Sequence, residues 1–300
     1  TSQIEPSSIS FPFRHVFRKQ KNLQIRLAEV LEIQPEKNSL QTDIGSFDYD
    51  YLVLANGCKT NFFGNANIER NAYTLKTTYE AIEIRNHITK NFESILSSDE
   101  RDKSPLLNLV IVGAGPTGVE LAGAFAELKR DVLPRDYPGI DFSSFSVYLI
   151  EGSKNTLNTM SDNARVASKD YLLKLGVHII TETFVQDYDG ETVLLSNGLK
   201  LQSSTVIWSA GVIGYKIAGL DDQSWTPTNR LIVDRFNKVT GYTNIFAIGD
   251  IACMSTPKYP KGHPQLANVA INQGRLLSKN LKKMLMNKPL TEYEYTDLGS

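Results

Sequence analysis

The sequence predicts an α/β fold with two three-layer domains, each built on a parallel sheet that is covered on both faces. Three observations predict it: short apolar strands that run into small-residue turns, a glycine-rich turn between a strand and a helix, and strand segments that recur at one fixed spacing. A chain of 300 residues that is 41% apolar and 22% charged can bury one large core or two medium-sized ones.

The charge balance and the cysteines exclude several classes of protein. The 32 Lys and Arg residues against 33 Asp and Glu residues leave a net charge of −1, which disfavours nucleic acid as a partner. Cys58 and Cys253 form no Cys-x-x-Cys pair, which argues against a disulfide scaffold, a metal site or a local redox disulfide and fits a reducing cytoplasm. The long apolar stretch 106–128 contains several glycines, Pro116 and Glu120, so we expect no transmembrane helix.

Two pairs of segments recur at the same spacing along the chain. Segments 23–29 and 177–183 both alternate apolar and polar residues, as half-buried strands do, and their offset is 177 − 23 = 154. Segments 51–57 and 205–211 are both short buried-type strands that end in a small-residue turn, with the offset 211 − 57 = 154. The repeated offset indicates a duplication, although generic strands can also coincide by chance in any α/β chain.

A glycine-rich turn precedes the second copy. The apolar strand 109–112 is followed at once by Gly113, Gly115 and Gly118, and then by the helix-forming run 119–128. In a Rossmann-like domain the first glycine makes the tight turn, the second lets the backbone approach a pyrophosphate, and the third permits close packing of helix on strand. The strand-turn-helix context favours a dinucleotide site over a glycine-rich turn without a ligand.

The start of this helix is the expected anion site. Pro116, Thr117 and Gly118 lie at the mouth of the helix, where unpaired N–H groups and a partial positive charge meet. Proline itself lacks an N–H, so the donors come from the residues around it. We expect this mouth to bind the diphosphate of a nicotinamide coenzyme.

Glu151 is the candidate for the carboxylate that binds the ribose hydroxyls of NAD. It follows the predicted strand 146–150, and it lies 151 − 118 = 33 residues after Gly118. The usual spacing is roughly 20 residues, and the prolines and glycine of segment 129–145 indicate an inserted loop that accounts for the excess. No arginine follows Glu151 directly, which favours NADH over NADPH. The alternative is an ordinary carboxylate in solvent at the end of a strand.

The repeat also predicts a glycine-rich turn that the sequence does not contain. Mapping Gly113 back by the same offset gives 113 − 154 = −41, a position before Thr1. We therefore expect that a first fingerprint lies upstream and that this chain is a fragment beginning after it. No leader peptide is visible at the amino end.

A strand over 243–248 enters the turn Gly249-Asp250, which by itself is a weak signal. Together with the other motifs it produces a resemblance to the FAD/NAD-linked reductase superfamily. The segments that carry this resemblance are 49–57, 113–123, 205–212 and 245–250. Within that superfamily, three segments are similar to type II NADH:quinone oxidoreductases, namely 61–64, 115–123 and 265–274.

The resemblance implies an NAD domain inserted in a discontinuous, here incomplete, FAD domain. The implied bounds are 1–72 and 227–300 for the FAD pieces and 73–226 for the NADH-binding domain. It also implies FAD and NAD(H) as cofactors. The site residues that follow from it, or from the strand ends it shares, are Asp250 for the ribityl chain of FAD, Gly249 for its close approach, Ala55 and Gly57 for the flavin turn, and Gly211 for the corresponding turn of the second copy.

Glu120 would face the nicotinamide and the flavin, again by resemblance. The alternative for this residue is a carboxylate that complements the helix dipole. The quinone-site pattern of the family, Ala-Gln-x-Ala-x-Gln, matches Ala267, Asn268, Ile271 and Asn272, with both glutamines replaced by asparagine. The alternative there is an amphipathic helix in which Ala267, Ala270 and Ile271 pack on the core.

The expected function is that of a flavin-dependent NADH dehydrogenase which passes hydride from NADH to FAD and electrons on to a quinone. The alternatives are a flavin reductase with a protein electron acceptor and a non-catalytic NAD-binding module. The resemblance further implies a peripheral protein at the cytoplasmic face of the inner membrane, held there by a segment after Ser300. A homodimer is among the expected partners. The histidines show no metal-ligand spacing and are expected to be surface or packing residues.

Overall fold

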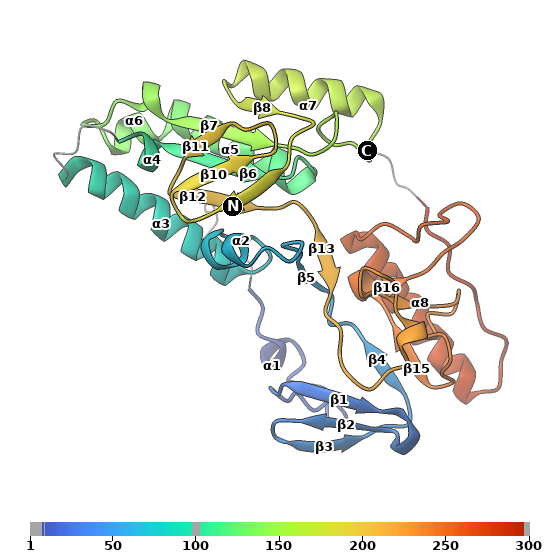
Figure 1. Ribbon diagram of the computed structural model, residues 1–300. Helices are drawn as coiled ribbons and strands as arrows, with labels where there is room; N and C mark the ends of the chain where they lie inside the picture. The colour runs from blue at the N-terminus through green and yellow to red at the C-terminus, as the bar shows by residue number, and fades with distance from the viewer. Residues whose placement is uncertain (1–7, 9, 98–102, 297–300) are drawn as a thin grey trace. The chain divides into compact units, whose positions relative to one another are not determined.

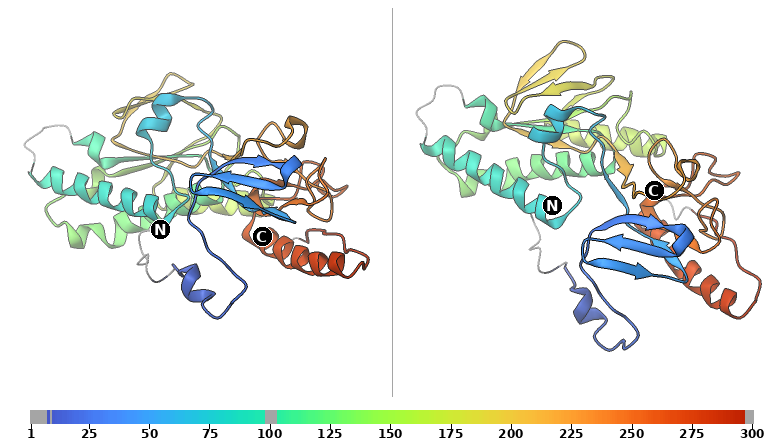
Figure 2. Two further views of the ribbon diagram at one scale, coloured as in Figure 1. Left: turned by 90° about the horizontal axis from the view of Figure 1, so that it is seen from below. Right: turned by 60° about the horizontal axis from the view of Figure 1, so that its bottom comes forward.

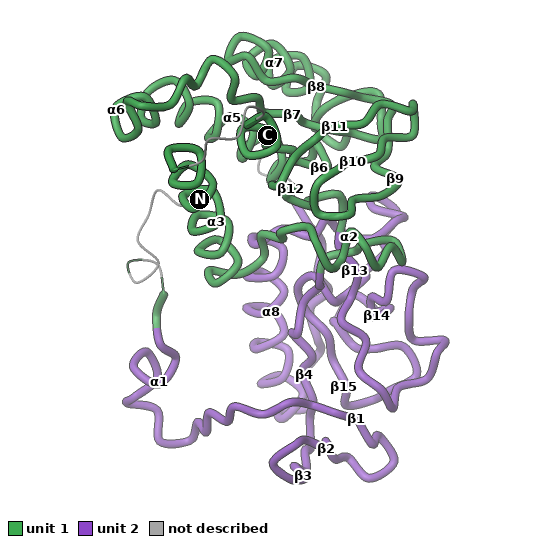
Figure 3. The backbone as a smooth tube through the Cα atoms, turned by 60° about the vertical axis from the view of Figure 1, so that its left-hand side comes forward, with its two compact units in different colours: residues 1–11, 60–211, 300 green, residues 12–59, 212–299 purple. Residues whose placement is uncertain are grey.

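The computed structural model describes residues 8, 10–97 and 103–296, which form two compact units. The first unit holds residues 60–211 with the described residues up to Phe11, and the second holds 12–59 and the chain from Val212 onward. Figure 3 shows the two units in green and purple. The chain therefore enters the first unit after Lys59 and leaves it after Gly211.

The first unit is built on a parallel sheet of four strands in the order β12-β6-β7-β8. These strands are β6 Asn108–Val112, β7 Ser146–Ile150, β8 His178–Ile180 and β12 Thr205–Trp208. A three-stranded antiparallel sheet of order β11-β10-β9 is made by β9 Val185–Tyr188, β10 Thr192–Leu195 and β11 Lys200–Gln202. The helices are α2 Ala66–Asn71, α3 Thr78–Ser97, α4 Ser104–Leu107, α5 Pro116–Asp131, α6 Leu133–Asp136, η3 Phe142–Ser144 and α7 Asp162–Lys174.

Alternate residues of β6 pack into two different cores. Leu109 and Ile111 belong to a cluster with α3, α5 and α7, whereas Val110 and Val112 belong to a cluster with α2 and the antiparallel sheet. Because successive side chains of a strand point to opposite faces, the parallel sheet is the middle of three layers. Figures 1 and 2 show the long helices on one side of it and β9 to β11 on the other.

The second unit contains short strands and one long helix. Its strands are β1 Val30–Gln34, β2 Ser39–Thr42, β3 Gly45–Asp48, β4 Leu52–Leu54, β5 Cys58–Thr60, β13 Val212–Gly214, β14 Leu231–Ile232, β15 Ile245–Ala247 and β16 Ala252–Cys253. Its helices are α1 Phe13–Val16, η2 Pro35–Lys37, η4 Asp222–Ser224, η5 Gly249–Ile251 and α8 Ala267–Leu285. The pair β4 and β15 is parallel, and with β1, β14 and α8 it contributes to one core that includes Ile33, Leu54, Leu231 and Ile245.

One predicted strand is wrong. Segment 23–29 is irregular, the strand begins only at Val30, and Leu27 is 93% exposed. The reason is the short partner: Val30 pairs with Thr42, where β2 ends and the chain turns toward β3, so no strand lies opposite the preceding residues. An apolar-polar alternation makes a strand only where a neighbour supplies the hydrogen bonds.

The other recurring pair of strands is confirmed. Strands β4 and β12 lie within segments 51–57 and 205–211, and each runs toward a glycine with positive φ, Gly57 at 68° and Gly211 at 149°. The offset extends to the next strands, since β5 begins at Cys58 and β13 at Val212, and 212 − 58 = 154. The offset of 154 residues therefore extends beyond the turns at which it was first found.

The inserted segment 129–145 is more ordered than a loop. It contains the end of α5, the short helix α6 and the turn η3, and Leu133, Phe142 and Phe145 are buried in the core beside α3. Aromatic packing with Phe92 explains the order, because the Phe92 ring lies 5.4 Å from Phe142 and 6.0 Å from Phe145 between centroids. Prolines and glycine marked an insertion correctly but did not reveal its buried aromatic residues.

The glycines of the turn before α5 should differ in their effect on stability. A Cβ added at Gly118 would lie 1.8 Å from the carbonyl oxygen of Gly113, whereas one at Gly115 would meet nothing within 4 Å. We expect Gly118→Ala to lower the free energy of unfolding by about 3 kcal/mol through overpacking, and Gly115→Ala to change it by less than about 0.5 kcal/mol. Urea denaturation of both variants checks this, and equal losses would contradict it.

Candidate functional site

The turn between β6 and α5 leaves backbone donors available. Gly113 has φ +98°, and its N–H donates to the carbonyl of Ile150 at 2.8 Å, so the turn is fixed against β7. Gly115 is the residue before the first turn of α5, and no side chain caps that helix start. Pro116 and Thr117 lie at the same end. The uncapped N–H groups of the first turn can therefore donate to an anionic ligand.

Glu151 lies directly against this turn. Its Oε2 accepts a hydrogen bond from the Ala114 N–H and its Oε1 one from the Ser153 N–H, each at 2.7 Å. Glu151 is half-buried and not fully exposed to solvent. A carboxylate has about four acceptor positions, so two remain for donors outside the protein chain.

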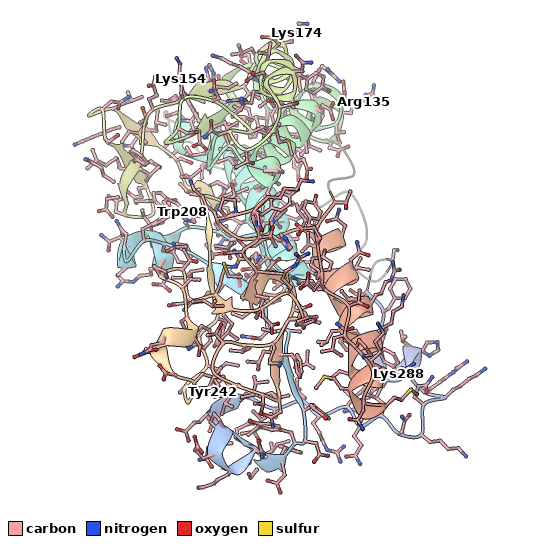
Figure 4. The ribbon with its side chains drawn as sticks, turned by 90° about the vertical axis from the view of Figure 1, so that its right-hand side faces the viewer. Arg135, Lys154, Lys174, Trp208, Tyr242 and Lys288 are labelled. Atoms are coloured by element: carbon pink, nitrogen blue, oxygen red, sulfur yellow. The ribbon has the colours of Figure 1, made fainter. Side chains whose placement is uncertain are left out.

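A cavity of about 520 Å³ opens beside Glu151. Its lining is mainly apolar and includes Phe63, Gly113, Glu151, Phe184, Trp208 and Ala210. Trp208, labelled in Figure 4, ends β12 and donates from Nε1 to the carbonyl of Asn61 at 2.8 Å. The arrangement is a concave, mainly apolar pocket with Glu151 and Gly113 of the glycine turn in its lining, which is typical of a site for a small organic ligand.

The sequence did not predict the aromatic residues of this cavity. Phe184 covers Gly152, where an added Cβ would lie 2.3 Å from the Phe184 ring. Phe63 has φ +52° and is 67% exposed. The absence of a side chain at Gly152, next to Glu151, was the one available signal that a ring lies close to the backbone there.

Two other predicted residues of the first unit lie near the same turns. Gly211 is half-buried, and the nearest atom to its added Cβ is in the Phe63 ring at 3.5 Å. Glu120 is exposed and is the fifth residue of α5, which begins at Pro116. A carboxylate interacts most strongly with the helix dipole in the first turn of a helix, and Glu120 lies beyond that turn.

In the second unit the predicted flavin residues occupy one end of the parallel pair β4 and β15. Leu54 pairs with Ala247, and the Ile248 N–H donates to the Leu54 carbonyl at 3.0 Å. Parallel strands end at the same edge, so the turn with Ala55 and Gly57 lies beside the turn with Gly249 and Asp250. Positive φ values of 68° at Gly57 and 72° at Gly249 give both turns a shape that favours glycine.

The predicted quinone residues lie at the start of α8. Ala267, Ile271 and Asn272 are exposed, and Ile271 is 52% exposed. The alternative of an amphipathic helix with Ala267, Ala270 and Ile271 on the core is therefore right about the helix having a buried face and wrong about Ala267 and Ile271, whereas Ala270 is half-buried. The buried residues of this helix are Val269, Gln273, Leu277 and Asn280. The residues at 269, 273, 277 and 280 repeat at spacings of three and four, which defines the inward face.

Asn268 differs from its exposed neighbours. It is half-buried, and its Oδ1 is inaccessible to solvent and has no hydrogen-bond partner among the described residues. A buried amide oxygen without a donor costs free energy.

Two histidines lie in packed surroundings, His263 buried and His87 half-buried. His87 Nε2 lies 2.9 Å from the Ser204 carbonyl and the ring lies 4.7 Å from that of Tyr73. Burial lowers the pKa of His87 and that of His263, so both are neutral near pH 7.

Across residues 8, 10–97 and 103–296, no three His, Cys, Asp or Glu side chains lie close enough to hold a metal ion. No helix in that same part is long and apolar enough to cross a membrane.

Comparison with known families agrees with this arrangement. Residues 1–274 match the family described as pyridine nucleotide-disulphide oxidoreductase. The type II NADH:quinone oxidoreductase Ndh of Mycobacterium tuberculosis is 32% identical over 321 residues, covering 100% of this chain and 67% of the relative. The type II NADH:quinone oxidoreductase of Staphylococcus aureus is 28% identical over 301 residues, covering 97% of this chain and 72% of the relative.

Solved structures show the same fold. NDH2 of Plasmodium falciparum in complex with NADH superposes with a TM-score of 0.70 at 27% identity, covering 76% of this chain and 50% of that one. A ferredoxin reductase from Rhodopseudomonas palustris reaches a TM-score of 0.74 at 20% identity, covering 97% of this chain and 65% of that one, and shows the fold alone. This chain thus spans between 50% and 72% of the length of these longer proteins.

These matches confirm the α/β fold class and the resemblance that the motifs predicted. The chain belongs to the pyridine nucleotide-disulphide oxidoreductase family, and within it to the type II NADH:quinone oxidoreductases.

Proposed function

We propose that this chain is part of a flavin-dependent dehydrogenase that takes hydride from NADH onto FAD and passes electrons on to a quinone. The observation that carries the proposal is Glu151 held against the glycine turn at the uncapped start of α5, beside the apolar cavity. The names of the relatives from M. tuberculosis and S. aureus, and the NADH bound in the P. falciparum structure, support the same activity.

The first unit fits a nicotinamide dinucleotide. The open space at Gly115 admits a diphosphate, and the N–H groups at the start of α5 would bind it. The two unused acceptor positions of Glu151 would bind the hydroxyls of a ribose. The same negative charge would repel a 2′-phosphate, which favours NADH over NADPH.

The second unit fits a flavin. Nothing lies within 4 Å of a Cβ added at Gly57, so that turn leaves room for a close ligand. Asp250, on the neighbouring turn, is half-buried and would accept hydrogen bonds from the ribityl chain of FAD. The flavin, when bound, supplies the chemistry of accepting a hydride and releasing electrons. We assign the nicotinamide site to the unit that holds residues 60–211 and the flavin site to the unit that holds 12–59 and the chain from Val212 onward. The bounds predicted from the sequence, 73–226 for the first and 1–72 with 227–300 for the second, lie 13 to 15 residues further along the chain.

The start of α8 fits a quinone. Asn268 offers a buried amide with an unused acceptor, and Asn272 follows one turn later. The exposed Ile271 beside them adds an apolar contact. We also propose that the protein attaches to the cytoplasmic face of a membrane and that it forms a homodimer. The ferredoxin reductase likeness rests on the fold and favours no protein acceptor.

Glu151 should determine the coenzyme preference. We expect Glu151→Gln to weaken NADH binding about tenfold, because charge-assisted hydrogen bonds to the ribose are lost. The preference for NADH over NADPH should narrow as the repulsion of the 2′-phosphate falls. Titration of both coenzymes measures this, with Glu191→Gln, an exposed carboxylate of the same unit, as the matched control. An unchanged preference would remove Glu151 from the site.

Asn268 should affect the quinone and not NADH. Asn268→Leu is expected to raise the quinone KM about tenfold, because one hydrogen bond is lost. The rate at which NADH bleaches the visible absorbance in stopped-flow should stay unchanged. Lys279→Leu, an exposed position further along α8, is the control for changes in the helix itself. A slower NADH step in Asn268→Leu would show that this block does not bind the quinone.

A further inference from the structure

The turn after β15 is held by Gln273, a side chain of α8. The sequence motifs assigned no role to this residue. The Gly249 N–H donates to Gln273 Oε1 at 2.7 Å. Gln273 is 1% exposed, and Gly249 has φ +72°. Gly249 is the first residue of the 3-10 turn η5, so its N–H has no partner within that turn and this side chain supplies the acceptor.

The other end of the same turn is also held by side chains. The Asp250 carbonyl accepts hydrogen bonds from Arg230 Nε at 2.9 Å, Gln265 Nε2 at 3.2 Å and the Cys58 thiol at 3.3 Å. The backbone between Gly249 and Ile251 is therefore fixed by donors on its carbonyl side and by an acceptor on its amide side. These contacts leave little freedom for the direction of the Asp250 side chain.

The packing of α8 allows it to approach this turn closely. A Cβ added at Gly249 would lie 3.4 Å from the Ala270 Cβ, and one at Gly274 would lie 3.7 Å from Ile248 Cδ1. Small residues on both sides of Gln273 thus bring the helix backbone near the turn. Its inward neighbours Val269 and Leu277 are apolar, so a buried amide at 273 is not needed for packing. A buried polar side chain is costly unless it is paired, and here it is paired with Gly249.

We propose that Gln273 is a positioning residue for the flavin: through the Gly249 amide it sets the backbone that directs Asp250 toward the ribityl chain. This inference rests on the proposed flavin site. It also ties the predicted quinone residues to that site, because Asn272 precedes Gln273 directly on the same helix. A change in the position of α8 would be transmitted to the Gly249–Asp250 backbone by one hydrogen bond.

Gln273→Leu tests the proposal, because it keeps the approximate volume and removes the acceptor. In the variant, hydrogen exchange at the Gly249 amide should become about tenfold faster and the Kd for FAD should rise about tenfold. FAD binding is measured by fluorescence titration of protein freed of flavin, and the midpoint potential of the bound flavin should shift. Gln273→Glu keeps an acceptor oxygen and should restore most of the Gly249 protection and of the FAD affinity.

Asn280→Leu is the matched control on the same helix. Asn280 is 2% exposed and holds Thr291 through both its amide groups, at 2.8 Å and 3.0 Å, away from the turn. We expect it to lower the melting temperature as Gln273→Leu does, because each loses a buried amide. In Asn280→Leu, hydrogen exchange at the Gly249 amide, the Kd for FAD and the midpoint potential of the bound flavin should match those of the unchanged protein.

The outcomes separate this inference from the proposed function. A Gln273→Leu protein that binds FAD as well as the unchanged protein would overturn the role of Gln273 and leave the flavin site standing. Equal losses of affinity in Gln273→Leu and Asn280→Leu would reduce Gln273 to a stability residue. Failure of the whole dehydrogenase to bind FAD in any variant would overturn both the proposed function and this inference.

Discussion

The close contact between the start of α5 and the end of β6 is the constraint on which the first unit depends. Gly118 lies against the Gly113 carbonyl without space for a side chain, and Ser209 Oγ donates to that same oxygen at 3.1 Å and to the Val112 carbonyl at 2.8 Å. A helix seated this close to the sheet has its first N–H groups directed at the crevice beyond the strand ends. Glu151 can reach Ala114 only because the turn is held in this place.

The second unit meets the same requirement by different means. Its turn at Gly249 follows a three-residue strand and leads to a single short helical turn, so no long helix start is available there. Buried side chains from separate segments take over the task, with Gln273 on the amide and Arg230 on the carbonyl side. Where backbone geometry does not fix a turn, side-chain hydrogen bonds from packed neighbours do so.

In both units, the polar groups that fix backbone turns differ from those that we propose to bind ligands. Interior hydrogen bonds fix backbone turns, whereas the groups proposed to meet ligands keep unused acceptors: two positions on Glu151 and the Oδ1 of Asn268. With a net charge of −1, recognition cannot depend on a field of the whole protein. Local donors and acceptors at the strand ends therefore carry the selectivity that we propose.

The sequence by itself determined the strands β6, β7 and β12, the helix α5, and the family, because buried strands and glycine turns are local features whose spacing is visible along the chain. The prediction for 23–29 was wrong, because a strand needs a neighbouring strand that the local pattern does not show. The contact of Phe184 with Gly152 was not predicted either, since the glycine was its only signal in the sequence. Only the tertiary structure decided that Gln273 faces inward while Ile271 faces solvent. The reason is physical: which face of a helix is buried, and which distant amide it meets, depends on the packing of segments remote in sequence.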